Sequence, residues 1–324
     1  MRKLCIMWFI CISCTPLGDR NYFDNQSNDL DSASVEEFDK NTFPSLLSIN
    51  ELLFDPLGDG ADYVEIVNVS RETIDLSAFS LANRNAAGVL GTGKRLSTGV
   101  CCLKPGGYCL LSGDTARVAA DYGCPSDSLR LQIKGFPSYP NESGCVVLTD
   151  QAGRIVDEFP YDKYLHHPLV AVREGIALEK LHPLLSSADP ASWTSAAADG
   201  GFGSPGRQNT QYRPWHLLPE ASENRFHASS EVFYPRRLGT DSQWRLHYRF
   251  TVGCVANVTV YDQVSVPCCT LADNLLLGGE GLVCWSGLDD EGRAVPFGRY
   301  LVRAQCHTAE GQVFRQFFVV AVQP

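Results

Sequence analysis

The chain has 324 residues, of which 44% are hydrophobic and 10% aromatic, enough to bury the cores of two domains of ordinary size. Its formal net charge is −10, which argues against a protein that binds the phosphate backbone of nucleic acids, because that task needs a basic face. With 28 Gly and 18 Pro but only 2 Met, the composition favours many strands and turns over a helical bundle.

The first 14 residues are expected to be a signal peptide. Arg2 and Lys3 give a positive start, and the apolar run 4–12 is too short to span a bilayer as a helix. The block from Cys11 to Cys14 resembles a bacterial lipobox, and this resemblance implies that Cys14 is lipidated and anchors the protein to a membrane. A plain cleaved signal is the alternative.

Residues 15–44 are rich in Asn, Asp, Ser and Glu, and they contain few large apolar side chains. Such a segment cannot bury enough surface to offset the entropy of ordering, so we expect a disordered acidic tether. Residues 212–225 are polar and contain Pro214 and Pro219, and they are predicted to be a linker between two folded domains.

Residues 45–211 are predicted to form the first domain, an all-β sandwich. Short strand-like runs recur between clusters of Gly, Pro, Asn and Asp, a spacing typical of sandwiches. A hairpin is expected at 149–154 and one short helical turn at 116–122. The expected strands lie in 48–56, 62–69, 108–112, 145–149 and 155–159.

The same domain resembles the bacterial lamin tail domain, which has an immunoglobulin-like β-sandwich fold. The resemblance implies a scaffold and interaction module found on exported and surface proteins. A filament function does not carry over, because no heptad coiled coil precedes the domain. The matching motifs follow one another as 48–56, 62–68, 74–81, 103–108, 147–150, 155–157, 175–180, Trp193 and 203–206.

Residues 226–324 are predicted to form a second immunoglobulin-like sandwich. Arg245, His247 and Arg249 alternate with apolar residues, which predicts a strand with one buried and one solvated face. Alternating or β-branched runs recur through this part of the chain. The expected strands are 244–252, 257–261, 282–285, 299–305 and 312–322.

The run 285–300 resembles the signature of the immunoglobulin-like module of flagellar hook-capping proteins, which is widespread at the ends of secreted bacterial proteins. We expect Trp285 to fill the core and the segment 290–292 to form a turn. Gly298 is expected to admit Tyr300 to the last strands. The structural residues predicted from this signature are Trp285, Gly287, Asp290, Gly292, Gly298 and Tyr300.

Ten cysteines follow the leader, five in each predicted domain. Exported proteins use cysteines mainly in disulfides. Because five is odd, either a bridge crosses between domains or chains, or some thiols stay free. We expect at least one free thiol per domain, at Cys145 and Cys284, which occupy apolar strand positions. The ten are Cys101, Cys102, Cys109, Cys124, Cys145, Cys254, Cys268, Cys269, Cys284 and Cys306.

Two clusters of side chains are candidate metal sites. His166 and His167 could bind a metal with nearby acids of segment 157–162, but a positioned nucleophile or third ligand is missing, so a structural loop is favoured. Asp55, Asp59 and Asp62 could bind calcium, although an acidic turn is the favoured interpretation. The sequence therefore predicts no catalytic residue, no cofactor and no metal ligand.

These features predict a non-enzymatic, exported protein at a bacterial outer membrane or cell surface, held there by a lipid anchor. It would act as an adhesion, scaffold or binding module for cell-surface proteins or polysaccharide, and no nucleic-acid partner is expected. Two alternatives stay open. One is an accessory protein of an extracellular hydrolase or nuclease, and the other is a secretion or assembly module.

Overall fold

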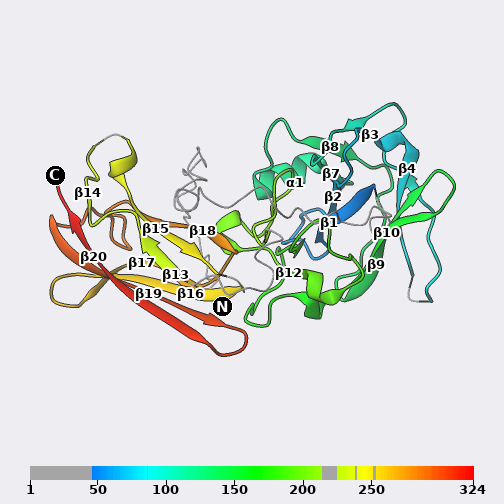
Figure 1. The fold of residues 1–324 in the computed structure, drawn as a ribbon. Helices are drawn as coiled ribbons and strands as arrows, with labels where there is room; N and C mark the ends of the chain where they lie inside the picture. Colours follow the sequence, from blue (N-terminus) through cyan, green and yellow to red (C-terminus); the bar gives the residue numbers. More distant parts are fainter. Residues whose placement is uncertain (1–45, 86, 214–224, 238, 251–252) are drawn as a thin grey trace, which may run out of the picture. The chain divides into compact units, whose positions relative to one another are not determined.

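The computed structural model describes residues 46–324, except 86, 214–224, 238 and 251–252 (Figure 1). The predicted signal peptide with its lipidation site Cys14, the acidic tether and most of the linker lie outside the described residues. Within the described part the protein is all-β, as the sequence predicted, and α1 (Thr115–Tyr122) is its one α-helix. This helix occupies the position of the predicted helical turn.

Residues 46–213, called here the N-terminal lobe, form a six-stranded sheet of order β12-β11-β1-β2-β7-β8 and a four-stranded sheet of order β10-β9-β4-β5. A short pair, β3-β6, completes it. All pairings are antiparallel except β7 with β8. The strands are β1 (Leu47–Leu53), β2 (Tyr63–Asn68), β3 (Ile74–Asp75), β4 (Phe79–Asn83), β5 (Lys94–Arg95), β6 (Cys102–Leu103), β7 (Tyr108–Ser112), β8 (Leu129–Gln132), β9 (Ser143–Asp150), β10 (Ile155–Asp162), β11 (Leu178–Lys180) and β12 (Trp193–Ser195).

The main core of this lobe is filled by side chains from both sheets, including Leu52 of β1 and Leu148 of β9. Phe159 and Trp193 stack within it, with ring centroids 3.6 Å apart. The register of β1 against β2 shifts between Ile49 and Glu51, a β-bulge. Ile49 and Leu52 both belong to the core, so Asn50 and Glu51 lie in succession outside it.

Residues 225–324, called here the C-terminal lobe, form a three-stranded sheet of order β13-β15-β18 and a five-stranded sheet of order β14-β20-β19-β16-β17. A second core cluster lies in this lobe and contains Trp244, Tyr248 and Trp285. The strands are β13 (Arg225–Ala228), β14 (Val232–Phe233), β15 (Trp244–Arg249), β16 (Cys254–Tyr261), β17 (Pro267–Leu277), β18 (Glu280–Trp285), β19 (Gly298–Thr308) and β20 (Val313–Val322).

Trp285 ends β18 inside the second core and is 1% exposed. Its ring centroid lies 5.2 Å from that of Tyr300 and 5.3 Å from that of Phe233. Its indole Nε1 donates to the carbonyl oxygen of Leu288 at 2.9 Å. The indole therefore joins the core to the turn that follows it.

The other residues of the signature shape the turn and its surroundings. Gly287 and Gly292 have φ of 78° and 76°, in the left-handed region that favours glycine. A carboxylate oxygen of Asp290 accepts a hydrogen bond from Thr270 N at 2.7 Å, which ties the turn to β17. A β-carbon on Gly298 would lie 2.5 Å from Nε2 of Gln263, so a side chain there would have to move the end of that glutamine.

We expect Trp285→Ala to destabilise the protein by about 3–5 kcal/mol, because it leaves a large cavity and frees the Leu288 carbonyl. Chemical denaturation followed by tryptophan fluorescence and circular dichroism measures the change. Tyr164→Ala, at an exposed aromatic, is the matched control and should be nearly neutral. Equal denaturation midpoints for both variants would show that Trp285 does not stabilise the fold.

Candidate functional site

Three glutamates lie side by side on neighbouring strands of the N-terminal lobe. Glu51 of β1 is paired in register with Glu65 of β2 on one side and with Glu179 of β11 on the other. All three side chains are 0% exposed. Isolated buried carboxylates are costly, so the group must be satisfied by hydrogen bonds or protons.

The segment 203–211 covers the glutamates and supplies many of their donors. Ser204 donates from its backbone N–H to Glu51 at 2.8 Å and from its hydroxyl to Glu179 at 2.7 Å. The backbone N–H of Gly206 donates to Glu65. The carboxylates therefore hold a loop that ends the N-terminal lobe.

Side chains complete this arrangement. Asn50 donates to Glu65 at 3.0 Å, and Tyr63 donates its hydroxyl to Glu51 at 2.9 Å. Asn209 donates to the carbonyl oxygens of Asn50 at 3.0 Å and Lys180 at 2.8 Å. We call the set of Asn50, Glu51, Glu65, Glu179, Ser204, Gly206 and Asn209 the carboxylate latch.

Burial and mutual repulsion raise the proton affinity of the carboxylate latch. The pKa of Glu51 is raised well above its usual value, first by burial and then by Glu179 and Glu65. Burial raises the pKa of Glu65 to about 8, against the hydrogen bonds it accepts, and it also raises the pKa of Glu179. Burial and the neighbouring carboxylates therefore favour the neutral form of the central carboxyl, Glu51.

A buried lysine lies beside the carboxylate latch. Lys180 donates from Nζ to the hydroxyls of Ser48 at 2.7 Å and Ser187 at 2.5 Å, and Ser187 donates to Asp157 at 2.6 Å. Burial lowers the pKa of Lys180 to about 8, and Asp157 partly opposes this. Lysine–serine pairs can act as nucleophiles. Here both hydroxyls are buried, and neither of the two surface hollows described below is lined by them.

The structure does not assemble the two metal-site candidates. His166 bonds through Nδ1 to the Ser195 hydroxyl at 2.9 Å, and burial lowers its pKa to about 4. His167 is also buried, and no described hydrogen bond or ion pair joins either histidine to Asp157, Glu158 or Asp162.

Asp55, Asp59 and Asp62 of the expected acidic turn do not share a common partner among the described residues. Asp59 faces solvent and contacts Arg117 at 3.4 Å, whereas Asp55 accepts a hydrogen bond from Asn141. Burial, and then Asp55, raise the pKa of Asp62 to about 7. Across the described ranges, no three His, Cys, Asp or Glu side chains are placed to hold a metal ion.

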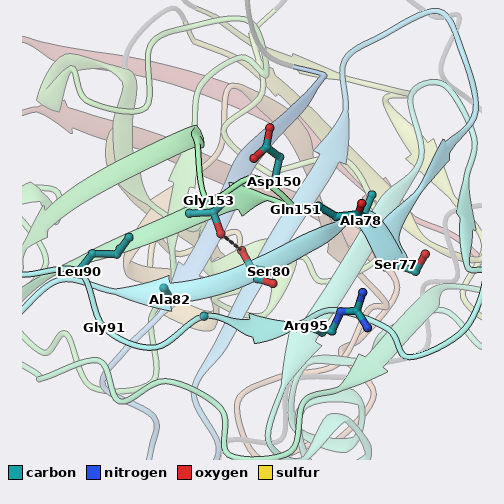
Figure 2. A pocket seen from close by; sticks show the side chains of 12 residues that line it. Ser77, Ala78, Ser80, Ala82, Leu90, Gly91, Arg95, Asp150, Gln151 and Gly153 are labelled. Atoms are coloured by element: carbon teal, nitrogen blue, oxygen red, sulfur yellow. Dashed lines mark hydrogen bonds between the residues drawn. The ribbon is translucent and has the colours of Figure 1, made fainter.

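A first hollow of about 510 Å³ lies on the four-stranded sheet of the N-terminal lobe (Figure 2). Its polar groups are largely occupied by their own turns. Asp150 accepts hydrogen bonds from Ala152 N and from Arg154, and the Ser77 hydroxyl donates to Asp75 at 2.9 Å. Asp150 and Ser77 of this hollow are thus engaged by their own turns.

A second hollow of about 430 Å³ lies on the outward side of the five-stranded sheet in the C-terminal lobe. It is crossed by residues that are paired in register across four strands. One such row runs from Thr270 through Thr259 and Arg303 to Phe317. A second row joins Asn257, Gln305 and Arg315, and a third joins Tyr261, Leu301 and Val319. We call these three rows the arginine face.

The polar floor of the arginine face is held in place by its neighbours. The Asn257 side chain donates to Asn274 Oδ1 at 3.2 Å and accepts from the Asn274 backbone N–H at 3.0 Å. Gln305 accepts from Arg315 Nε at 2.7 Å and contacts His307 Nε2 at 2.8 Å. These contacts fix the amides before any ligand arrives.

Arg303 is the exception at the centre of the arginine face. Its guanidinium lies 5.4 Å from the centroid of the Tyr261 ring, and its Nε is buried without a hydrogen-bond partner in the described structure. No ion pair is formed by Arg303 or Arg315 within the described residues, although Arg84, Arg117, Arg154, Arg249 and Arg293 each have one. Phe317 of β20, which is paired in register with Arg303 of β19, is 58% exposed.

Sequence reasoning found neither group. The glutamates of the carboxylate latch are scattered along the chain from 51 to 179, and only strand pairing brings them together. For the arginine face there was a signal: Arg299, Leu301, Arg303 and Gln305 alternate with buried residues along β19. That alternation identifies an exposed row but does not show which strands flank it.

Comparisons with known proteins leave the family open. No protein-family model and no curated protein sequence matches the chain. Among solved structures, CopC from Methylosinus trichosporium OB3b is 18% identical and covers 30% of this chain and 90% of its own, with a TM-score of 0.21. At such TM-scores the likenesses carry no argument.

Two further structures are similar at the same level. Dimeric latent PorU from Porphyromonas gingivalis is 9% identical over 88% of this chain and 21% of its own, with a TM-score of 0.22. PorZ from the same organism, a bacterial surface component of the type-IX secretion system, is 11% identical over 84% of this chain and 30% of its own, with a TM-score of 0.22. The chain therefore spans less than a third of either protein's length.

A helix that spans a membrane needs a long apolar stretch. Among the helices of the described residues, none has the length and apolar character needed to cross a bilayer.

The carboxylate latch predicts a pH-dependent stability with a defined sign. A carboxyl whose pKa is raised on folding binds more protons in the folded state, so stability falls as pH rises from the unfolded pKa of about 4.5 towards the folded pKa. We expect Glu51→Gln, which mimics the protonated acid, to flatten this fall. Each pKa unit corresponds to about 1.4 kcal/mol.

Urea denaturation of the wild type and Glu51→Gln between pH 6.5 and 8 measures the effect. His166, with its pKa lowered to about 4, stays neutral in the folded state throughout this range. Glu72→Gln, at an exposed glutamate, is the matched control and should follow the wild type. Parallel curves for wild type and Glu51→Gln would show that Glu51 carries no excess proton.

Proposed function

We propose that this chain is a non-enzymatic, exported cell-envelope protein that binds acidic polysaccharide through the arginine face. The unpaired guanidinium of Arg303, set in a hollow among fixed polar side chains, is the observation that carries the proposal. The N-terminal lobe is proposed to be the supporting module, similar to a lamin tail domain. The convergence of its scattered motif residues in the carboxylate latch supports that part.

A carboxylate-bearing ligand suits the charges of the arginine face. Residues 212–324 contain ten Arg and no Lys, and the protein as a whole has a net charge of −10. A guanidinium offers planar, paired donors that match a carboxylate, and it also stacks on rings, as Arg303 does on Tyr261. Arg303 in the hollow and Arg315 beside it therefore supply two positive charges, while Asp273 also lines the hollow.

A sugar ring suits the remaining groups of the arginine face. Pyranose rings present hydroxyls at their edges and C–H groups on their flat sides. The Thr259 hydroxyl and the amides of Asn257 and Gln305 supply polar partners for the edges, while the exposed ring of Phe317 offers an apolar surface. The rows run across the strands, so successive sugar units would follow one row.

Binding of the full-length protein to polygalacturonate, a polymer of uronic acids, tests the proposal by affinity electrophoresis or calorimetry. We expect Arg303→Gln to weaken binding by about 10- to 100-fold, the range for losing a charge-assisted hydrogen bond. Arg71→Gln removes an equal charge from an exposed position in the N-terminal lobe and should leave binding unchanged.

Dextran, a neutral polymer, provides the second comparison. Equal binding of dextran and polygalacturonate would contradict a carboxylate-recognising site. Equal loss of binding in Arg303→Gln and Arg71→Gln would reduce the effect to overall charge.

The proposed location rests on the lipid anchor. We expect labelled fatty acid to enter the full-length protein in a lipoprotein-processing bacterium and to be absent from Cys14→Ser, since the thiol is the acceptor. Gel fluorography of the membrane fraction is the measurement. Label in both forms, or in neither, would reject the anchor and leave only a cleaved signal.

A further inference from the structure

Cys254 and Cys306 lie diagonally across two neighbouring antiparallel strands. Cys254 of β16 is paired with Thr308, and Cys306 of β19 is paired with Ala256. The two cysteines are therefore offset by two residues along the strands. Both side chains belong to the core of the C-terminal lobe and are 0% exposed. They therefore project from the same side of the sheet.

The two thiols lie close together in that core. Hydrogen bonding with Cys306 is the first cause of the raised pKa of the Cys254 thiol. Diagonal neighbours in an antiparallel pair have β-carbons somewhat closer than about 7–8 Å, and a disulfide needs α-carbons no more than about 7 Å apart. The closeness of the thiols at this diagonal means that a small adjustment of side-chain rotamers and strand twist suffices to join the sulfurs.

We propose that Cys254 and Cys306 form an intramolecular disulfide that joins β16 to β19 beneath the arginine face. The chemistry requires an external oxidant, which is a disulfide-containing protein or small molecule. One cysteine thiolate attacks that disulfide, forming a mixed disulfide and releasing one thiol. The second cysteine thiolate then attacks the mixed disulfide at the protein sulfur and releases the other thiol. Two protein thiols are oxidised, and one disulfide is reduced to two thiols.

The bond forms before the core closes. An oxidant cannot reach side chains that are 0% exposed in the folded protein. The hydrogen bond from Cys306, followed by burial, also raises the pKa of Cys254, so its reactive thiolate is scarce once the protein has folded. The disulfide therefore belongs to the folding pathway.

The bond also has a positional consequence. Asn257 and Thr259 of β16 and Arg303 and Gln305 of β19 lie on the opposite side of the same two strands. A covalent link between these strands fixes their register under the centre of the arginine face. Formation in the cell rests on the proposed export to an oxidising compartment, whereas formation in vitro does not.

The full-length chain is denatured, reduced and refolded with a mixture of oxidised and reduced glutathione, or with reduced glutathione alone. Free thiols are then alkylated under denaturing conditions without reduction, and the peptides are analysed by mass spectrometry. We expect a Cys254–Cys306 cross-linked peptide only in the oxidised sample, together with a higher Tm than in the reduced sample.

Cys306→Ala should lose the cross-link and the Tm difference between oxidised and reduced samples. Cys269→Ala, at a buried cysteine of the same core, should retain both. Complete alkylation of Cys254 and Cys306 in oxidatively refolded wild-type protein would overturn the proposal, as would a cross-link of either residue to another cysteine. This mapping uses wild-type protein, so it remains decisive even when a variant fails to fold.

Discussion

The carboxylate latch is the constraint on which the N-terminal lobe depends. Glu51, Glu65 and Glu179 would repel one another and disrupt the sheet if all were ionised and unpaired. They are tolerated because the segment 203–211 brings backbone and side-chain donors to them and because burial raises the pKa of the central carboxyl, which favours its neutral form. The loop in turn is fixed by the carboxylates, since it forms no strand of its own. A fully hydrogen-bonded polar network under a loop specifies a single position of that loop. An apolar surface is less specific because its contacts have no direction.

Arg303 of the arginine face differs from the buried carboxylates in its hydrogen bonding. The carboxylates of the N-terminal lobe are buried and fully engaged, whereas Arg303 is left with a buried Nε that lacks a partner, beside an open hollow. An unsatisfied buried donor costs about 1–3 kcal/mol unless a ligand completes it. Of the two surface hollows, the one on the N-terminal lobe has Asp150 and Ser77 engaged by local turns.

The sequence predicted the all-β class and about half of the strands in the described residues, because alternation and turn residues are local signals. The stretch 108–112 matches β7, and the hairpin at 149–154 connects β9 to β10. β17 was missed for a physical reason: its register shifts repeatedly against β16 and Asn274 has a positive φ of 50°, which breaks the alternation. The carboxylate latch and the arginine face were missed because both are products of strand pairing. Their members are ordinary residues in sequence, and only the register between strands gives them neighbours.

The end of the carboxylate latch continues into the C-terminal lobe. Glu179 accepts the backbone N–H of Gln211 at 2.8 Å, and the Gln211 side chain donates to the Leu277 carbonyl at 3.4 Å at the end of β17. Nearby, Gly279 N donates to the Thr210 carbonyl at 3.3 Å, and Tyr248 of the second core donates its hydroxyl to Asp199. β-carbons on Gly278 and Gly281 would collide with Thr210 and with Tyr248 and Asp199, so glycine is required for this approach. In the proposed role, a protein anchored at its N-terminus and holding a polymer on its C-terminal lobe carries tension through these contacts. Burying them, and tying them to Glu179, places the mechanical junction where water cannot compete for its hydrogen bonds.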